Sequence, residues 1–395
     1  MESRYNAYKA AFHGRPMPFA YVDLERFDAN IEAIATRAAG KPVRVASKSV
    51  RCVAMLRRIL EHPACSGVMA YSAREAVFLA GHGFDDILVA YPVLSEVAAS
   101  GVLDTIGRGK RIILMVDCPA HLTHLDTLAR QAGVVMPVCL DVDMSSCYPG
   151  IYFGVRRSPV RTPEDALAVW AACAALSHVR LVGVMGYEAQ VAGVQDFGPC
   201  GFLKNKLIGV LKKRSMREVC ARRAAVVQAL TDAGCQLEFV NGGGTGSVDL
   251  TTREEAVTEV TAGSGFYAPT LFDHYAQFKH EPAAGYAIEI VRRPAPGIYT
   301  CQGGGYIASG AAGPDKLPQP CLPEGAGLIA QEGAGEVQTP IVYKGREQLE
   351  LGGPVFMRHA KAGELCERFN TLLLLEGGEV SGEVPTYRGE GMCFV

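Results

Sequence analysis

Eight short apolar runs, most of them separated by stretches with helical patterning, constrain the fold of this chain most strongly. They are residues 43–46, 67–71, 87–90, 112–116, 137–142, 181–184, 237–240 and 259–262. Continuous apolar runs of this length are typical of strands buried on both faces. Helical stretches between such strands predict repeated βαβ units, and eight units are the number that closes into a barrel. We therefore predict an α/β fold with a (β/α)8 TIM barrel.

An open, doubly wound sheet is the alternative arrangement of the same units. That fold normally places a glycine fingerprint after its first strand. In this chain Lys48 stands at the corresponding place, after the run 43–46. The sequence therefore favours the barrel.

The sequence pattern changes beyond about Pro282, where short strand-like runs are separated by Gly and Pro. This pattern predicts an antiparallel β domain. We expect the barrel to span residues 18–280 and the β domain to span 281–395, to which residues 1–17 could contribute. The strand-like stretch Pro18–Asp23 could belong to either part.

Lys48 is the first residue with potential for chemistry. It lies where the first predicted strand should end, and barrel active sites lie at the carboxyl ends of the strands. A lysine that faces a pocket there can lose its proton through desolvation and become a nucleophilic amine. The alternative for Lys48 taken alone is a solvated loop residue.

Two glycine-rich turns follow the seventh and eighth predicted strands, at Asn241–Ser247 and Gly263–Tyr267. A single turn of this kind is explained by the conformational needs of a tight turn. Two of them in these places form the usual phosphate site of a barrel, where bare backbone N–H groups converge on the anion. Together with Lys48 they imply a phosphorylated cofactor with an aldehyde, which is pyridoxal phosphate.

The chain resembles the fold-type III pyridoxal-phosphate enzymes, the alanine racemase-like barrels. Within them it is most similar to the D-threonine aldolase / D-serine dehydratase-like branch, also labelled amino acid deaminase/aldolase. The matching stretches are Pro18–Asp23, Arg44–Lys48, Arg156–Pro159, Gly186–Gln190, Gly242–Gly246, Gly263–Asp273, Arg358–Glu364 and Thr386–Glu390.

The resemblance implies a role for each site residue. Lys48 would be the Schiff-base lysine, and Arg157 (or Arg156) would contact the phenolic oxygen of the cofactor ring. Tyr187 and Gln190 would line the pyridine ring. The residues implied to hold the phosphate are Gly244, Thr245, Gly246, Gly263 and Ser264, and Tyr267 would touch phosphate or substrate. For Glu188 a structural ion pair is favoured over a catalytic role.

One departure from the family pattern concerns a metal. Metal-dependent members of the branch hold a divalent ion through a His-x-Cys or His-x-Asp pair, whereas here Thr371 and Leu373 fall at those positions. Neither residue makes a divalent site. For His359, Glu364 and Cys366 we favour polar contacts and a core thiol over a metal site. We therefore assign no metal ligand. Another group must then act on the substrate hydroxyl, and the candidates are Tyr187, His359 and His274.

These observations predict a pyridoxal-phosphate-dependent lyase for a small β-hydroxy amino acid in the D configuration. It would act by retro-aldol cleavage or by dehydration, with Lys48, Tyr187 and His359 as catalytic residues. The alternatives are an amino acid racemase or epimerase, and a non-catalytic pyridoxal-phosphate binding protein.

Charge and cysteine usage limit the partners and the compartment. Net charge is −2, and the only basic run, Lys212–Arg214 with Arg217, Arg222 and Arg223, lies on a helical pattern that we interpret as a solvated face. We expect no nucleic-acid partner. The 13 cysteines include no CxxC pair, as in a reducing compartment. No apolar run approaches the ~20 residues of a membrane span. We expect a cytoplasmic homodimer that acts on a small amino acid, dimerisation being a property of the family.

Overall fold

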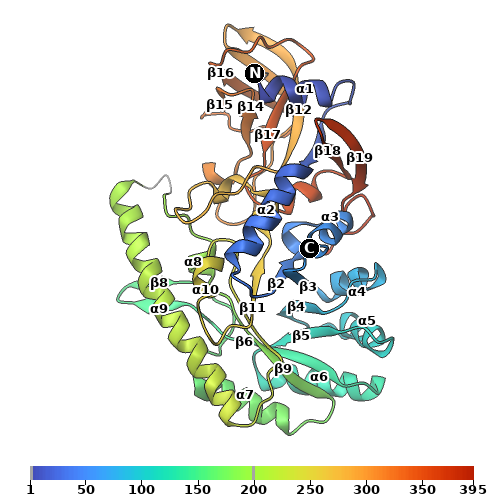
Figure 1. The fold of residues 1–395 in the computed structure, drawn as a ribbon, viewed down its shortest axis with the longest axis vertical. Helices are drawn as coiled ribbons and strands as arrows, with labels where there is room; N and C mark the ends of the chain where they lie inside the picture. The colour runs from blue at the N-terminus through green and yellow to red at the C-terminus, as the bar shows by residue number, and fades with distance from the viewer. Residues whose placement is uncertain (1–2, 198–200) are drawn as a thin grey trace.

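The computed structural model describes residues 3–197 and 201–395, which form a parallel β/α barrel and a separate, largely antiparallel sheet (Figure 1). In Figure 1 the barrel occupies the lower half of the molecule and the sheet lies at the top, with helix α2 (Leu24–Arg37) between them.

The eight barrel strands follow one another around a closed ring in chain order, each parallel to its neighbours. The strands are β2 (Val43–Ala46), β3 (Cys65–Ala70), β4 (Ile87–Pro92), β5 (Ile112–Val116), β6 (Met136–Asp141), β9 (Val179–Gly186), β10 (Phe239–Gly242) and β11 (Glu259–Ala262). The predicted fold class is confirmed, and every predicted strand is present with its ends within two residues of the expected positions.

The side chains of these strands are buried on both sides, which is why each strand appears as an uninterrupted apolar run. Inside the barrel, Leu88, Ile113 and Phe239 belong to one compact buried cluster. Their strand neighbours, such as Val89 and Leu114, belong to the larger core outside the ring. The sequence pattern therefore indicated the strands without indicating which face each residue occupies.

Helices cover the outside of the barrel, and short elements form the loops at its rim. The longer helices are α2, α3 (Val53–Leu60), α4 (Ala73–Gly81), α5 (Glu96–Gly107), α6 (Pro119–Ala132), α7 (Pro163–Ala174) and α9 (Phe202–Asp232). The short elements are η1 (Ser47–Ser49), β7 (Ser146–Tyr148), β8 (Ile151–Phe153), α8 (Ala189–Ala192), α10 (Val248–Thr251), α11 (Ser264–Tyr267) and η2 (Thr270–Phe272). Helix α7 begins with a capping box formed by Thr162 and Asp165.

The β domain is built around a nine-stranded sheet in which one run of neighbours is β15-β16-β13-β12-β1-β18-β19. Its strands are β1 (Phe19–Asp23), β12 (Ala284–Ala295), β13 (Ile298–Gln302), β14 (Gln319–Leu322), β15 (Ala326–Leu328), β16 (Gln338–Tyr343), β17 (Pro354–Arg358), β18 (Thr371–Glu376) and β19 (Glu379–Pro385). Helix α1 (Arg4–Ala11) and the short helices η3 (Pro314–Lys316) and η4 (Glu364–Glu367) accompany them.

The N-terminal strand β1 belongs to this sheet and not to the barrel. It pairs antiparallel with β12 and parallel with β18. Helix α1 packs on the same sheet, because the rings of Tyr5 and Tyr8 contact Phe356 of β17 edge to face. A barrel that starts at residue 18 is therefore wrong for β1. Its partners lie more than 260 residues away along the chain, and nothing local in the sequence specifies them.

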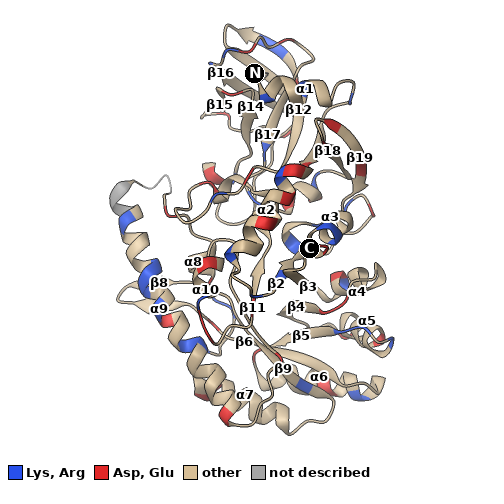
Figure 2. Cartoon of the chain, in the orientation of Figure 1, with Lys and Arg blue, Asp and Glu red and all other residues tan. Residues whose placement is uncertain are grey.

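The basic run on α9 is only partly a solvated face, which corrects our interpretation. Figure 2 shows blue segments along this helix, and Lys213, Arg214 and Arg217 are exposed. In contrast, Lys212 is buried with its Nζ 2.6 Å from Asp196 Oδ1, and Arg223 is completely buried. Neither α9, although it has 31 residues, nor any other helix in the described part of the chain is long and apolar enough to cross a membrane.

Arg44 fixes the amino-terminal side of the barrel. Its guanidinium group is buried and donates to Glu259 Oε1 and Oε2 at 2.7 and 3.0 Å and to Asp86 Oδ2 at 2.8 Å. These contacts join the beginnings of β11 and β4 to β2. Burial lowers the pKa of Arg44, but the two carboxylates outweigh this effect and raise it, so the side chain stays charged.

We expect the substitution Arg44→Met to destabilise the protein by about 3–5 kcal/mol, because it leaves the buried carboxylate of Glu259 without its partner. The urea midpoint of unfolding measures this change. Arg180→Met is the matched control, since Arg180 pairs with Glu238 at the surface, where such pairs contribute about 0–1 kcal/mol. Equal midpoints for the two variants would contradict the prediction.

Candidate active site

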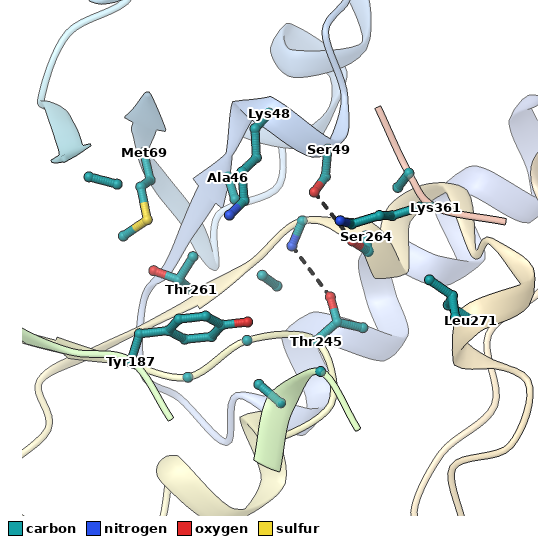
Figure 3. Close-up of a pocket in the computed structure, with 18 of the residues that line it drawn as sticks. Ala46, Lys48, Ser49, Met69, Tyr187, Thr245, Thr261, Ser264, Leu271 and Lys361 are labelled. Carbon is teal, nitrogen blue, oxygen red and sulfur yellow. Dashed lines mark hydrogen bonds between the residues drawn. The ribbon is translucent and has the colours of Figure 1, made fainter. Parts of the chain in front are cut away.

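A cavity of about 310 Å³ opens at the carboxyl ends of the barrel strands (Figure 3). This volume lies in the usual range of small-molecule sites. The charged and polar residues that line it are Lys48, Ser49, Arg51, Tyr91, Arg157, Tyr187, Asn241, Thr245, Thr261, Ser264, Ser309, Lys361 and Glu364. Barrel and β domain therefore both contribute to one site.

Lys48 lies in the short helix η1, directly after β2, and its side chain extends into the cavity (Figure 3). Its Nζ is 3.5 Å from the hydroxyl of Tyr91, at the end of β4. Burial raises the pKa of Tyr91, but the positive charges of Lys48 and Arg157 outweigh it, so the pKa is lowered overall. The lysine thus faces a phenol with enhanced acidity.

Arg157 lies between two aromatic rings of the cavity wall. Its guanidinium carbon is 5.7 Å from the ring centre of Tyr91 and 5.8 Å from that of Tyr187. Arg156 instead lies over Tyr152, 4.1 Å from the ring centre, and does not line the cavity. Of the two arginines considered, Arg157 is therefore the one that reaches the site.

The two glycine-rich loops after β10 and β11 are bonded to each other across the cavity floor. Thr245 Oγ1 accepts hydrogen bonds from the backbone N–H groups of Gly265 at 3.1 Å and Gly263 at 3.5 Å. The hydroxyls of Ser49 and Ser264 are 3.3 Å apart (Figure 3). The loops therefore form one continuous cradle.

The shape and donors of this cradle suit a phosphate. A Cβ on Gly244 would lie 2.9 Å from the ring of Tyr187, and one on Gly263 would lie 2.9 Å from Ala46 Cβ, so only glycine fits at both positions. Among the described residues, no acceptor pairs with the backbone N–H groups of Thr245 and Ser264. Unpaired N–H groups beside glycines are what an anion requires.

Glu188 holds the first of these loops from behind. Its carboxylate is completely buried and accepts hydrogen bonds from Ser247 Oγ at 2.6 Å, Thr251 Oγ1 at 2.5 Å and the N–H of Gly243 at 3.3 Å. It also pairs with Arg223 of α9 at 2.8 Å. The structural role predicted for Glu188 is therefore confirmed.

Seven of the predicted site residues line the cavity together, namely Lys48, Arg157, Tyr187, Gly244, Thr245, Gly263 and Ser264. Gly246 does not line it, because its α-carbon packs against Ala192 and Tyr275. Burial raises the pKa of Tyr187 to about 12.

Gln190, Tyr267 and His359 are buried and do not line the cavity, so their contacts with cofactor or substrate stay a prediction that this geometry does not support. Gln190 donates to Met144 O at 2.6 Å and to Ser215 Oγ at 2.9 Å. Tyr267 donates to Val50 O at 3.1 Å. His359 packs against the ring of Tyr267, and burial lowers its pKa to about 3. In each case the side chain points between packed elements.

The sequence analysis missed several residues of the cavity wall. Tyr91 directly follows the predicted run 87–90 and stands at the active-site end of β4. Ser309 and Lys361 reach the cavity from the β domain. Lys361 lies within the family-like stretch Arg358–Glu364, which was the available signal.

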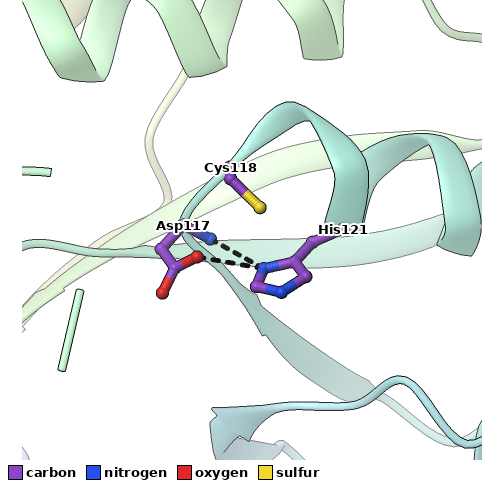
Figure 4. Close-up of side chains that lie close together, drawn as sticks. All are labelled: Asp117, Cys118 and His121. Carbon is purple, nitrogen blue, oxygen red and sulfur yellow. Dashed lines mark hydrogen bonds and ion pairs between the residues drawn. The ribbon is translucent and has the colours of Figure 1, made fainter. Parts of the chain in front are cut away.

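Asp117, Cys118 and His121 form the only group of three potential metal ligands found among the described residues (Figure 4). Their ligand atoms lie within 4.8 Å of one another, where β5 leads into α6. His121 Nδ1 is 3.1 Å from Asp117 Oδ1, and none of the three lines the cavity. The group is thus a contact at a helix start, apart from the candidate site.

We expect Glu188→Gln to weaken binding of pyridoxal phosphate about tenfold or more, because a charged hydrogen bond in the support of the loop is worth about 1.5–3 kcal/mol. Titration of the cofactor-free protein, followed by visible absorbance, measures the affinity. Pyridoxal without phosphate should bind both proteins equally. Glu218→Gln, on the outer part of α9, is the control. Equal loss of affinity for pyridoxal would show that the change is not specific to the phosphate loop.

Comparisons with known proteins place this geometry in a family. Residues 22–270 match the model of the family described as alanine racemase, N-terminal domain. D-threonine aldolase of Arthrobacter sp is 24% identical over 290 residues, which cover 71% of this chain and 69% of that protein. The structure of D-threonine aldolase from Filomicrobium marinum has a TM-score of 0.81 at 20% identity and 95% coverage of both chains.

D-threo-3-hydroxyaspartate dehydratase from Delftia sp. HT23 has a TM-score of 0.77 at 20% identity, with coverage of 94% of this chain and 98% of that one. These two structures share the complete two-part fold. The family model covers most of the chain and includes Lys48 and both glycine-rich loops. The chain therefore belongs to the alanine racemase N-terminal domain family.

Proposed function

We propose that this protein is a pyridoxal-phosphate-dependent lyase that acts on a small β-hydroxy amino acid in the D configuration. The observation that carries the proposal is that Lys48 shares one cavity with two cross-bonded glycine loops, in which the N–H groups of Thr245 and Ser264 have no acceptor among the described residues. The relatives named as D-threonine aldolase and D-threo-3-hydroxyaspartate dehydratase support the substrate class.

The residues present fit the cofactor. Gly244, Thr245, Gly263 and Ser264 would hold its phosphate, with the N–H of Gly246 as a further donor. The ring would lie beside Tyr187, and Arg157 would bind its phenolic oxygen.

Lys48 and the walls of the cavity would carry out the proton transfers. Lys48 Nζ would bind the aldehyde and, after a substrate amine displaces it, would move a proton to or from the substrate Cα. When bound, pyridoxal phosphate withdraws electrons from that carbon. The hydroxyl of Tyr91, 3.5 Å from Lys48 Nζ, would hold the amine of Lys48 in place. The β-domain residues above the cavity would exclude water and orient the substrate.

A specific observation favours a lyase over a non-catalytic binding protein. Ser309, Lys361 and Glu364 of the β domain line the cavity, although all the residues proposed to contact the cofactor belong to the barrel. Additional polar groups above the cofactor site are useful for a substrate and unnecessary for storage. The racemase alternative requires acid and base groups on both faces of the cofactor, and the relatives named above favour a lyase.

We also infer a cytoplasmic location and a homodimer. The 12 free cysteines in the described part of the chain support a reducing compartment. The homodimer is inferred because dimerisation is common in the family that the chain resembles.

We expect purified protein reconstituted with pyridoxal phosphate to be yellow, and borohydride to fix the cofactor on Lys48. Peptide mass mapping identifies the modified residue. Lys48→Ala should give no modified peptide, whereas Lys344→Ala, at an exposed lysine of the β domain, should behave as the wild type. A protein that stays colourless with added cofactor would contradict the proposal.

Incubation with D-threonine and with D-threo-3-hydroxyaspartate should release an aldehyde or a keto acid, and chelator should not abolish the reaction. This expectation follows because Thr371 and Leu373 occupy the positions of the expected metal ligands. Aldehyde and keto acid formation are assayed in deuterium oxide, so that deuterium at Cα of the recovered substrate reveals a racemase. Racemisation without either product would favour the racemase alternative. Complete loss with chelator would show a metal site that the sequence did not reveal.

A further inference from the structure

Lys361 is a second lysine in the same cavity, and neither the proposed cofactor contacts nor the family model, which ends at residue 270, accounts for it. It lies in the loop between β17 and η4, on the β-domain side, and its amino group points toward the cavity that Lys48 enters from the barrel side (Figure 3). A substrate bonded where Lys48 Nζ binds would therefore lie next to Lys361.

The loop that carries Lys361 is held directly against the backbone of Lys48. A Cβ on Gly363 would lie 2.0 Å from Lys48 O, and its φ of +87° also favours glycine. Arg51 ties the two parts together, because it donates to Lys48 O at 2.9 Å and to Glu367 Oε1 at 2.6 Å. The relative position of the two lysines is thus fixed by packing.

Lys361 has polar partners that orient its amine. Its Nζ donates to Ser309 Oγ at 2.7 Å, and the N–H of Ser309 donates to Glu364 Oε1 at 3.0 Å and Oε2 at 3.2 Å. Burial lowers the pKa of Lys361, and the positive charges of Lys48 and Lys316 add to this effect. Glu364 and Tyr91 act in the opposite direction but do not outweigh these effects, so the pKa of Lys361 is lowered overall.

The other candidates for action on the substrate hydroxyl are less suited. His359 lies in the core outside the cavity, and His274 does not line it. Tyr187 lines the cavity, but its pKa of about 12 makes it a phenol that is protonated at neutral pH. None of the three both lines the cavity and has a pKa that burial lowers, as Lys361 does.

We propose that Lys361 binds the β-hydroxyl of the substrate and accepts its proton, the task that a divalent ion assists in metal-dependent relatives. This inference rests on the proposed function. The O–H bond breaks and its proton moves to Lys361 Nζ, which acts in its deprotonated form, while the oxygen forms a carbonyl with Cβ. The Cα–Cβ bond breaks, its electron pair stays on Cα, and Cα takes a proton delivered by Lys48. The products are an aldehyde and the shortened amino acid.

The test separates the hydroxyl from the rest of the substrate. Cleavage of D-threonine or of D-threo-3-hydroxyaspartate yields glycine, which has no Cβ, and microscopic reversibility requires the enzyme to exchange its Cα proton. In Lys361→Ala we expect cleavage to fall about 10²- to 10⁴-fold, the range of general acid–base catalysis. The rate at which glycine exchanges its Cα proton in deuterium oxide should stay within about threefold of the wild type, because glycine has no hydroxyl on which Lys361 could act. The affinity for pyridoxal phosphate should stay within the same about threefold range.

Two further variants test the nature of the effect. Lys361→Arg keeps the positive charge but cannot give up its proton, so KM should change little while kcat falls. Added ethylamine should partly restore cleavage by Lys361→Ala and leave glycine exchange unchanged. Lys344→Ala is the control for loss of a β-domain lysine outside the cavity.

Each other outcome overturns the assignment in a recognisable way. Equal loss of cleavage and glycine exchange would indicate that Lys361 binds the substrate carboxylate. Weaker binding of pyridoxal phosphate would indicate a contact with the phosphate. Unchanged cleavage, or a wild type that dehydrates the substrate, would exclude a base at the hydroxyl. A wild type that binds the cofactor but transforms neither substrate would instead refute the proposed function.

Discussion

The buried ion pair between Arg223 and Glu188 is the interaction on which the site depends most directly. Both side chains are completely buried, and the desolvation of such a pair is offset only with the help of further contacts. Gly186 O accepts from Arg223 at 2.7 Å, while Ser247 and Thr251 donate to Glu188. Helix α9, the end of β9 and the loop after β10 are therefore locked in one arrangement. The cradle proposed to hold the phosphate is consequently shaped by the packing of the protein.

The burial of the barrel strands explains why the barrel half of the molecule could be predicted well from the sequence. Strands buried on both faces produce apolar runs that can be found without knowing their partners. Lys48 and the glycine loops were found because their function follows from their place at strand ends. Strand β1 shows the limit of that reasoning: it has the same local character, but its partners β12 and β18 are specified only by contacts distant in sequence.

The direction of a side chain after a strand end was the least predictable feature. Tyr187 and Gln190 are three residues apart, yet Tyr187 lines the cavity and Gln190 bonds to Met144 in the core. No period of 2 or 3.6 applies in such a turn, so the backbone path decides which residue faces inward. His359 and Lys361 repeat this difference in the β domain.

The barrel residues and the β-domain residues of the cavity therefore concern different aspects of function. The family match ends at residue 270 and covers Lys48 and the phosphate cradle, whereas Ser309, Lys361 and Glu364 lie beyond it. The barrel residues concern the cofactor, which many reactions share, and only groups near the substrate side chain can select among those reactions. The loop with Lys361 is packed on the backbone of Lys48, whereas Thr371 and Leu373, at the positions of the expected metal ligands, lie in β18. An amine acting from the loop in place of a metal held by the strand, as proposed for Lys361, would leave the barrel half of the molecule intact.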